Sequence, residues 1–173
     1  MSTRTLQNLI EMDSVLYYNT IKDSYENLYS REQSSKIRFL LSRIDIKESD
    51  KILDVGAGTG ILESILAKNK IVAIEPSDMA DMMDAKRLKN VLIERRRIQD
   101  FDTEEKFDVI FCITVLQDIK EGREEIIKKL FSLARAGGHV IISVLRASNM
   151  DLKHMGPVES GFIENDRYFI FIV

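Results

Sequence analysis

Residues 52–60 read ILDVGAGTG, a short apolar run followed by glycines at alternate positions. Glycine tolerates positive φ and lets a ligand come close to the backbone. A glycine loop that leads from a strand into a helix also presents backbone N–H groups that have no partner inside the helix, and these favour a bound anion or polar group. The stretch therefore predicts a loop that holds a nucleotide or another nucleoside-containing cofactor.

Short apolar runs alternate with helical patterns along the chain. The runs that predict strands lie at 51–55, 71–75, 90–96, 107–115 and 139–145. The patterns that predict helices lie at 61–68, 77–88 and 121–135. Gly137-Gly138 is expected to end the last of these helices. Strands that alternate with helices indicate a parallel sheet with helices on both faces, and the short connections predict a doubly wound α/β fold.

The segment before the first strand has a helical pattern. Apolar residues between Ile37 and Ile44 recur at the spacing of an amphipathic helix, and the residues before them are rich in tyrosine. We expect residues 1–48 to form a helical cap on a core of residues 49–173, within one compact domain.

The C-terminal segment predicts two more strands. GFI at 161–163 and RYFIFIV at 167–173 are apolar and β-prone, and Asn165-Asp166 between them favours a turn. RYFIFIV would be buried between two other strands. At an edge of the sheet it would pair with another chain, so a homo- or hetero-oligomer through this strand is an open alternative.

The composition excludes several classes of protein. A net charge of −3 over 173 residues gives no overall attraction to nucleic acid or to an anionic membrane. There is no apolar stretch of the roughly 20 residues that a membrane span needs and no secretory signal, so we expect a cytoplasmic protein. Cys112 is the single cysteine, and His139 and His154 lack partners at metal-ligand spacing. No disulfide and no metal site are expected.

The residues after the loop narrow the choice of cofactor. A P-loop needs Lys and Ser or Thr after its last glycine, but Ile61 follows Gly60. The dinucleotide fingerprint needs glycine or alanine at position 61, so Ile61 excludes this pattern as well. What remains is the pattern D-x-G-x-G-x-G, which begins at Asp54.

This pattern, together with IVAIEPSDM at 71–79, resembles the class I S-adenosylmethionine-dependent methyltransferases. The resemblance covers about residues 15–146. It implies a Rossmann-like, mostly parallel sheet with an antiparallel C-terminal strand. It also implies that the chain binds S-adenosyl-L-methionine, releases S-adenosyl-L-homocysteine and transfers a methyl group.

The resemblance assigns cofactor-binding residues. Those implied are Asp54, Gly56, Ala57, Gly58, Gly60, Glu75, Pro76, Met79, Ile98, Gln99, Cys112, Tyr17 and Tyr25. Among them, Asp54 would orient the loop and the cofactor's ammonium group, and Glu75 would accept hydrogen bonds from both ribose hydroxyls. Tyr17 or Tyr25 would close over the methionine end.

The adenine contact departs from the family. Relatives often have an acidic residue where this chain has Arg97, and arginine cannot accept a bond from an amino group. Gln99 or Asp100 could make the contact instead, or the backbone of Ile98 alone.

The acceptor side departs as well. Gln117 and Asp118 occupy a place where many small-molecule relatives carry two histidines, so they are candidate catalytic residues together with Tyr25. Methyl transfer from a sulfonium depends mainly on positioning, and a base is needed when the nucleophile is protonated. We expect a small-molecule acceptor. The alternatives are an RNA acceptor, suggested by six basic residues within 86–97, a protein acceptor, and a non-catalytic cofactor-binding partner subunit.

Overall fold

The structure, a computed structural model, describes residues 14–173 apart from the side chains of 22–28. The strands are β1 (Lys51–Val55), β2 (Lys70–Ile74), β3 (Val91–Glu94), β4 (Phe107–Ile113), β5 (Ala134–Leu145), β6 (Glu159–Ile163) and β7 (Asp166–Ile172). The α-helices are α2 (Ser14–Leu41), α3 (Ile61–Ile65), α4 (Met79–Ala85) and α5 (Arg123–Leu133). Short 3₁₀ turns are η1 (Ile98–Asp100), η2 (Leu116–Asp118), η3 (Arg146–Ser148) and η4 (Lys153–Met155).

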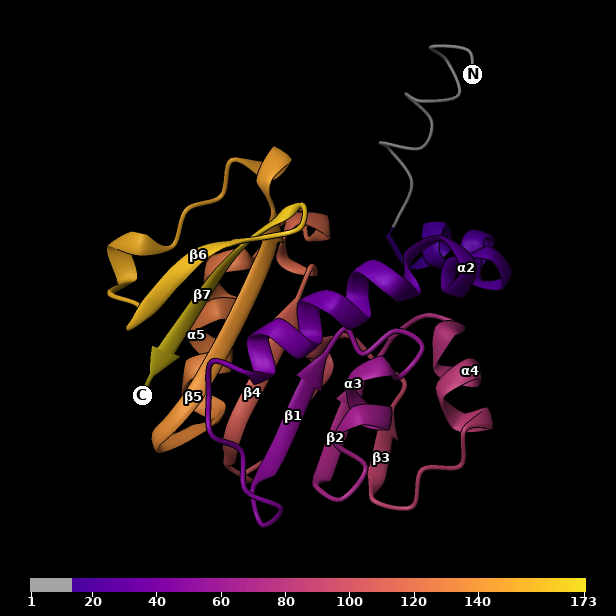
Figure 1. Cartoon of the computed structure of the whole chain (residues 1–173), viewed down its shortest axis with the longest axis horizontal. Helices are drawn as coiled ribbons and strands as arrows, with labels where there is room; N and C mark the ends of the chain where they lie inside the picture. The colour runs from indigo at the N-terminus through magenta and orange to yellow at the C-terminus, as the bar shows by residue number, and fades with distance from the viewer. Residues whose placement is uncertain (1–13) are drawn as a thin grey trace.

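The strands form one sheet in the order β3-β2-β1-β4-β5-β7-β6. Strands β1 to β5 pair in parallel, whereas β7 pairs antiparallel with both β5 and β6 (Figure 1). The order reverses between β1 and β4, and in folds of this kind ligands bind beyond the carboxyl ends of the strands at that point. The predicted Rossmann-like sheet with an antiparallel C-terminal strand is confirmed.

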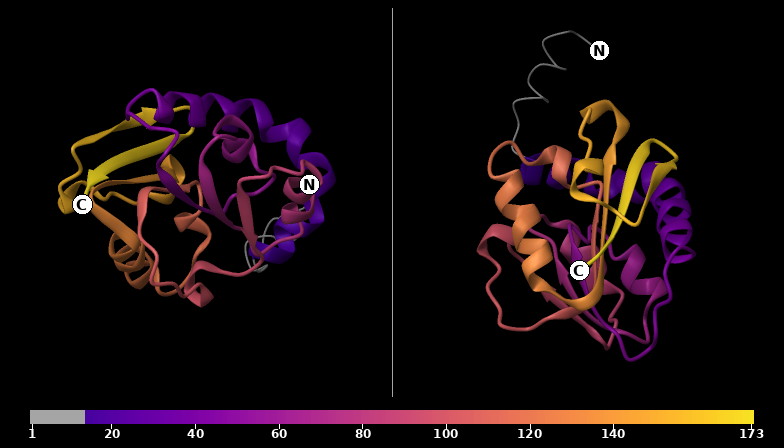
Figure 2. Two further views of the ribbon diagram at one scale, coloured as in Figure 1. Left: turned by 90° about the horizontal axis from the view of Figure 1, so that it is seen from below. Right: turned by 90° about the vertical axis from the view of Figure 1, so that its left-hand side faces the viewer.

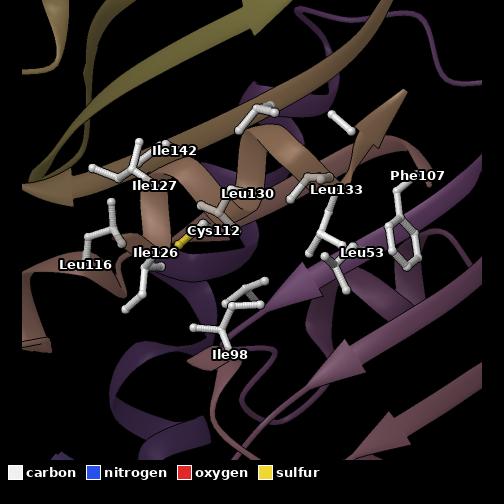
Figure 3. Packing of buried hydrophobic residues seen from close by; sticks show 14 of the residues in the cluster. Leu53, Ile98, Phe107, Cys112, Leu116, Ile126, Ile127, Leu130, Leu133 and Ile142 are labelled. Carbon is white, nitrogen blue, oxygen red and sulfur yellow. The ribbon is translucent and has the colours of Figure 1, made fainter. Parts of the chain in front are cut away.

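Helices cover both faces of the sheet, with α5 on one side and α2 and α3 on the other (Figure 2). Leu53 and Cys112 point to the α5 face, where Ile126 and Leu130 of the helix pack against them (Figure 3). The alternate residues of the same strands, such as Ile52, pack toward α2 and α3. Because β1 and β4 are buried on both faces, they read as continuous apolar runs.

The glycine pair after α5 does not end that helix, contrary to the sequence prediction. The helix ends at Leu133, and Ala134 is already extended with ψ 149°. Gly137 and Gly138 lie inside β5, where the register against β4 is irregular. A Cβ on Gly138 would come within 2.8 Å of the Asp108 carbonyl oxygen, so the close approach of the two strands explains the glycine.

The C-terminal strand lies inside the sheet. RYFIFIV belongs to β7, which has β5 on one side and β6 on the other, and Phe169 and Phe171 are buried. The two edges of the sheet are formed by β3 and β6, so β7 itself has no open edge along which another chain could pair. None of the helices in the described part of the chain is both long and apolar enough to cross a membrane.

Candidate functional site

The glycine loop adopts a backbone that requires glycine. Gly56, Gly58 and Gly60 have φ of 77°, 57° and 79°. The amide N–H groups of Gly56 and Ala57 both donate to the carbonyl oxygen of Ile74, at 2.8 and 3.1 Å, which ties the loop to the end of β2. A Cβ on Gly56 would lie 2.3 Å from Cγ2 of Val115, so this position tolerates no side chain without a shift.

Glu75 at the end of β2 holds the loop from the other side. Its side chain is buried, and Oε2 accepts a hydrogen bond of 2.8 Å from the Gly58 amide. Oε1 accepts from the amide and the hydroxyl of Ser77, at 2.8 and 2.5 Å. Since each carboxylate oxygen can accept two bonds, Oε2 keeps capacity for a ligand hydroxyl.

Two further carboxyl groups are buried beside the loop. Asp54 at the end of β1 is 4% exposed and Glu63 on α3 is fully buried. With Asp54 ionised, neither oxygen of Glu63 has a hydrogen-bond donor among the described residues, whereas a protonated Asp54 can donate to Glu63. Burial, and then the proximity of Glu63, raises the pKa of Asp54 well above its usual value. Burial also raises the pKa of Glu63 to about 7, although its own backbone amide, Asp54 and the charge of Lys86 act in the opposite direction.

Sequence reasoning missed Glu63. A carboxylate among the apolar residues of ILESI signals a buried charge, but the helical pattern alone does not show that it faces Asp54. The three carboxyl groups of Asp54, Glu63 and Glu75 form a cluster of one charge sign at the glycine loop, which we call the carboxyl cluster. Such a cluster favours a cationic ligand and disfavours a phosphate.

A cavity of about 500 Å³ opens beyond the carboxyl ends of β1, β2 and β4, beside the glycine loop. The predicted site residues that line it are Asp54, Gly56, Ala57, Gly58, Glu75, Pro76, Met79, Ile98, Gln99 and Asp118. Residues from loops more than 60 positions apart thus meet in one hollow, as expected at the switch point of a doubly wound sheet.

Four predicted residues do not line this cavity. The Cα of Gly60 faces Met83, whose Cγ would lie 2.6 Å from an added Cβ. Cys112 lies in the core against α5, where burial raises the pKa of its thiol (Figure 3). The Gln117 side chain turns back, and its amide nitrogen donates a hydrogen bond of 2.7 Å to the Thr114 carbonyl oxygen. Tyr17 is the fourth, and the Tyr25 side chain lies outside the described residues.

Tyr18 lines the cavity in place of Tyr17. The two rings pack edge to face with their centroids 5.4 Å apart. At 3.6 residues per turn, Tyr18 lies about a quarter of a turn from the direction of Ile37, whereas Tyr17 lies almost half a turn away, near the opposite side of the helix. Counting the helical angle back from the buried Ile37 would therefore have selected Tyr18.

Helix α2 contacts two loops that border the cavity. The Tyr18 hydroxyl donates to Oδ2 of Asp118 at 2.9 Å, and the Asp78 amide donates to Oδ1 of Asn19 at 2.7 Å. Burial raises the pKa of Asp118, while the bonds from Tyr18 and Gln117 lower it. A carboxyl with a raised pKa, hydrogen-bonded at the wall of a cavity, is suited to accept a proton.

Some of the basic residues within 86–97 are paired with carboxylates and are therefore less available to a polyanion such as RNA. Arg95 forms ion pairs with Asp81 and Asp84, at 2.7 and 3.6 Å, and Arg96 pairs with Glu94 at 2.8 Å. Arg97 lines the cavity next to Ile98 and Gln99. Within the described residues no group of three His, Cys, Asp or Glu side chains could hold a metal ion.

Comparison with known proteins gives the family of this chain. A model described as "Methyltransferase domain" matches residues 25–171. A ubiquinone biosynthesis O-methyltransferase of Vibrio vulnificus is 28% identical over 64% of this chain, and the chain spans about half the length of that relative.

Two solved structures share the fold. A SAM-dependent methyltransferase from Aquifex aeolicus has a TM-score of 0.67 at 19% identity, over 87% of this chain and 98% of that one. The DhpI–SAH complex has a TM-score of 0.64 at 20% identity, over 96% and 81%. With the glycine loop, the carboxyl cluster and the cavity at the switch point, the family match leads to one conclusion: the chain belongs to the methyltransferase domain family.

Proposed function

We propose that the chain transfers a methyl group from S-adenosylmethionine to a small-molecule acceptor in the cavity beside the glycine loop. The observation on which this depends is the meeting of a positive-φ glycine loop with three buried carboxyl groups at the switch point of the sheet. When bound, S-adenosylmethionine supplies an electrophilic methyl group on a sulfonium.

The charge of the site supports this cofactor. S-adenosylmethionine carries an ammonium and a sulfonium, and both would stabilise the ionised forms of Asp54 and Glu63, which burial disfavours. NAD and nucleoside triphosphates carry phosphates, which the same carboxyl groups repel. The glycine loop then binds polar atoms of the ligand through backbone N–H groups rather than a pyrophosphate through a lysine.

The roles of individual residues follow from their positions. Asp54 would bind the ammonium, Oε2 of Glu75 would accept from a ribose hydroxyl, and the backbone of Gly56 to Gly58 would surround the methionine part. Pro76 and Met79, with Ile98 and Gln99, would enclose the nucleoside. Gly60 and Cys112 shape the loop and the core without reaching the ligand.

On the acceptor side, Asp118 is the base in our proposal. Its carboxylate would take the proton from an O–H or N–H nucleophile as that atom bonds to the methyl carbon, and Tyr18 would hold the carboxylate in place. Tyr17 and Gln117 support this arrangement from behind, through the Tyr18 ring and the Thr114 carbonyl oxygen.

A small-molecule acceptor agrees with a cavity bordered by α2 and with the name of the Vibrio relative. An RNA acceptor has less support, because Arg95 and Arg96 of the basic stretch are engaged in ion pairs. We therefore place the acceptor between α2 and the loops after β4.

Calorimetry with S-adenosylmethionine, S-adenosylhomocysteine and NAD tests the cofactor. We expect the first two to bind and NAD not to bind. Asp54→Asn should weaken binding of both by about tenfold or more, since it removes a charged hydrogen-bond acceptor. Asp102→Asn changes an exposed carboxylate before β4 and serves as the matched control. Tight binding of NAD alone would contradict the proposal.

The acceptor is tested with S-adenosylmethionine carrying a labelled methyl group, incubated with fractionated cell extract. We expect label in the small-molecule fraction. Label in the RNA or protein fraction would overturn the acceptor assignment. Cofactor binding without label in any fraction would favour the role of a non-catalytic partner subunit.

A further inference from the structure

A lysine is fully buried beneath the cavity, which calls for an explanation. Lys36 on α2 has no exposed surface, and its Nζ lies 2.8 Å from Oδ1 of Asp166, itself fully buried on β7. Glu32, one helical turn away, lies 3.8 Å from the same nitrogen. The free energy needed to remove a lysine and a carboxylate from water can exceed the free energy that their attraction recovers. A buried ion pair is therefore weak evidence for a role in stability.

The pair converges on Thr114, the residue after β4. Lys36 Nζ donates to Thr114 Oγ1 at 2.9 Å, and that hydroxyl donates to Oδ2 of Asp166 at 2.7 Å. The Ser143 hydroxyl donates to the same Oδ2 at 2.6 Å, and the Thr114 amide donates to the Ser143 carbonyl oxygen at 2.9 Å. We call these four residues the Lys36 network.

Thr114 is held in an unfavourable conformation. Its φ is 57°, in the left-handed region that β-branched residues rarely adopt. Strained residues persist where surrounding contacts over-determine them, and they gather at functional sites. The amide, the hydroxyl and the carbonyl oxygen of Thr114 are each engaged by a different element of the fold.

Thr114 also lies between the cavity and the glycine loop, so a shift of this residue would change both. It lines the cavity, and the next residue, Val115, packs so closely on Gly56 that a Cβ there would be 2.3 Å away. The turn at 114–115 therefore borders both the acceptor side and the glycine loop. Methyl transfer is an in-line displacement, and misplacement of the reacting groups by about 1 Å can cost a hundredfold in rate.

We propose that the Lys36 network is a positioning device, which fixes the turn at Thr114 and so sets the alignment of acceptor and cofactor. This inference rests on the proposed function. Lys36 is a positioning residue and not a base, because it does not line the cavity and its Nζ is bonded to Thr114 and Asp166. Through Lys36 and Asp166, helix α2 and strand β7 both bond directly to the turn at Thr114.

The test compares Thr114→Ala, which loses the hydroxyl, with Thr114→Ser, which keeps it. We expect labelled methyl transfer at saturating S-adenosylmethionine to fall about tenfold to a hundredfold in Thr114→Ala and to return to within about threefold of wild type in Thr114→Ser. The calorimetric Kd for S-adenosylhomocysteine should change by less than about threefold in both. Lys36→Met should follow Thr114→Ala, and if it does not fold, the Thr114 variants decide.

The matched control is Arg43→Met. Arg43 follows α2 and pairs with Glu159 of the same C-terminal hairpin, but this pair is partly exposed and does not border the cavity. It should transfer at the wild-type rate. Wild-type transfer by Thr114→Ala would refute the positioning role while leaving the proposed function intact. A wild-type protein that binds no cofactor, or transfers no label, would remove both.

Discussion

Two buried groups of charged side chains border the same cavity, and they are satisfied in different ways. In the Lys36 network the carboxylate of Asp166 faces a cation and two hydroxyl donors, so its charge is balanced inside the protein. In the carboxyl cluster Asp54 and Glu63 face each other, and Lys86 offsets part of the repulsion.

The difference separates positioning from binding. A buried charge that the protein itself satisfies holds elements together in one geometry, as Lys36 joins α2 to β4 and β7. A buried charge that the protein leaves unsatisfied costs stability, and a cationic ligand can recover that cost. Substitutions in the two groups should therefore change stability in opposite directions.

The largest effect is expected from Lys36→Met. It leaves the carboxylate of Asp166 buried without its cation, which should lower the free energy of unfolding by about 3–5 kcal/mol. Arg43→Met removes a partly exposed pair between neighbouring segments and should cost less than about 1 kcal/mol. Urea unfolding of both variants measures the difference. Equal losses would show that Asp166 is not dependent on the lysine.

This contrast also marks how far the sequence could predict the site. The glycine loop and Glu75 could be placed at one end of the sheet because their spacing is local, within about 25 residues of one strand–helix–strand unit. The Lys36 network joins residues 130 positions apart, and each of them reads as an ordinary surface residue along its own element. Which polar residues are buried together depends on the order of strands in the sheet, and periodicity does not give that order.

The errors have similar causes. Gly137 and Gly138 were expected to end a helix, since a glycine pair after a helical pattern is a common end signal. Here the approach of β5 to β4 requires them inside a strand. Tyr17 and Tyr18 are adjacent in the sequence, so a tyrosine-rich segment does not choose between them, whereas the direction of α2 against the sheet places Tyr18 at the cavity.

A smaller effect of opposite sign is expected from Glu63→Gln. The folded-state pKa of Glu63, about 7, lies above that of an unfolded glutamate, about 4.3. The stability that Glu63 contributes is therefore present in full below pH 4.3 and is lost as the pH rises through 7. Its amide replacement can donate to Asp54 and does not ionise. The Glu63→Gln variant should therefore be more stable than wild type by about 2–3 kcal/mol at pH 8, and by less at pH 5.

Thermal or urea unfolding from pH 5 to pH 8 measures this difference. Glu48→Gln, at an exposed glutamate that pairs with Lys68, is the control and should run parallel to wild type at all pH values. A stability difference between Glu63→Gln and wild type that does not grow with pH would mean that the carboxyl groups are not in conflict.

Asp118 is an intermediate case, since it is half-buried, its hydrogen-bond donors are the neutral groups of Tyr18 and Gln117, and the charge of Arg123 offsets only part of the effect of burial. Tyr18→Phe removes a hydrogen bond that favours the charged carboxylate, so the pKa of Asp118 should rise further. The loss of stability should be about 1 kcal/mol at pH 7 and should become smaller as the pH falls and the carboxyl takes up a proton. Tyr17→Phe is the matched control, because the Tyr17 hydroxyl interacts with Tyr29 and its loss should cost the same as the pH falls. If the loss of stability in Tyr18→Phe were also independent of pH, the hydrogen bond from Tyr18 would not favour the charged form of Asp118. Asp118 would then be a poor candidate for the base.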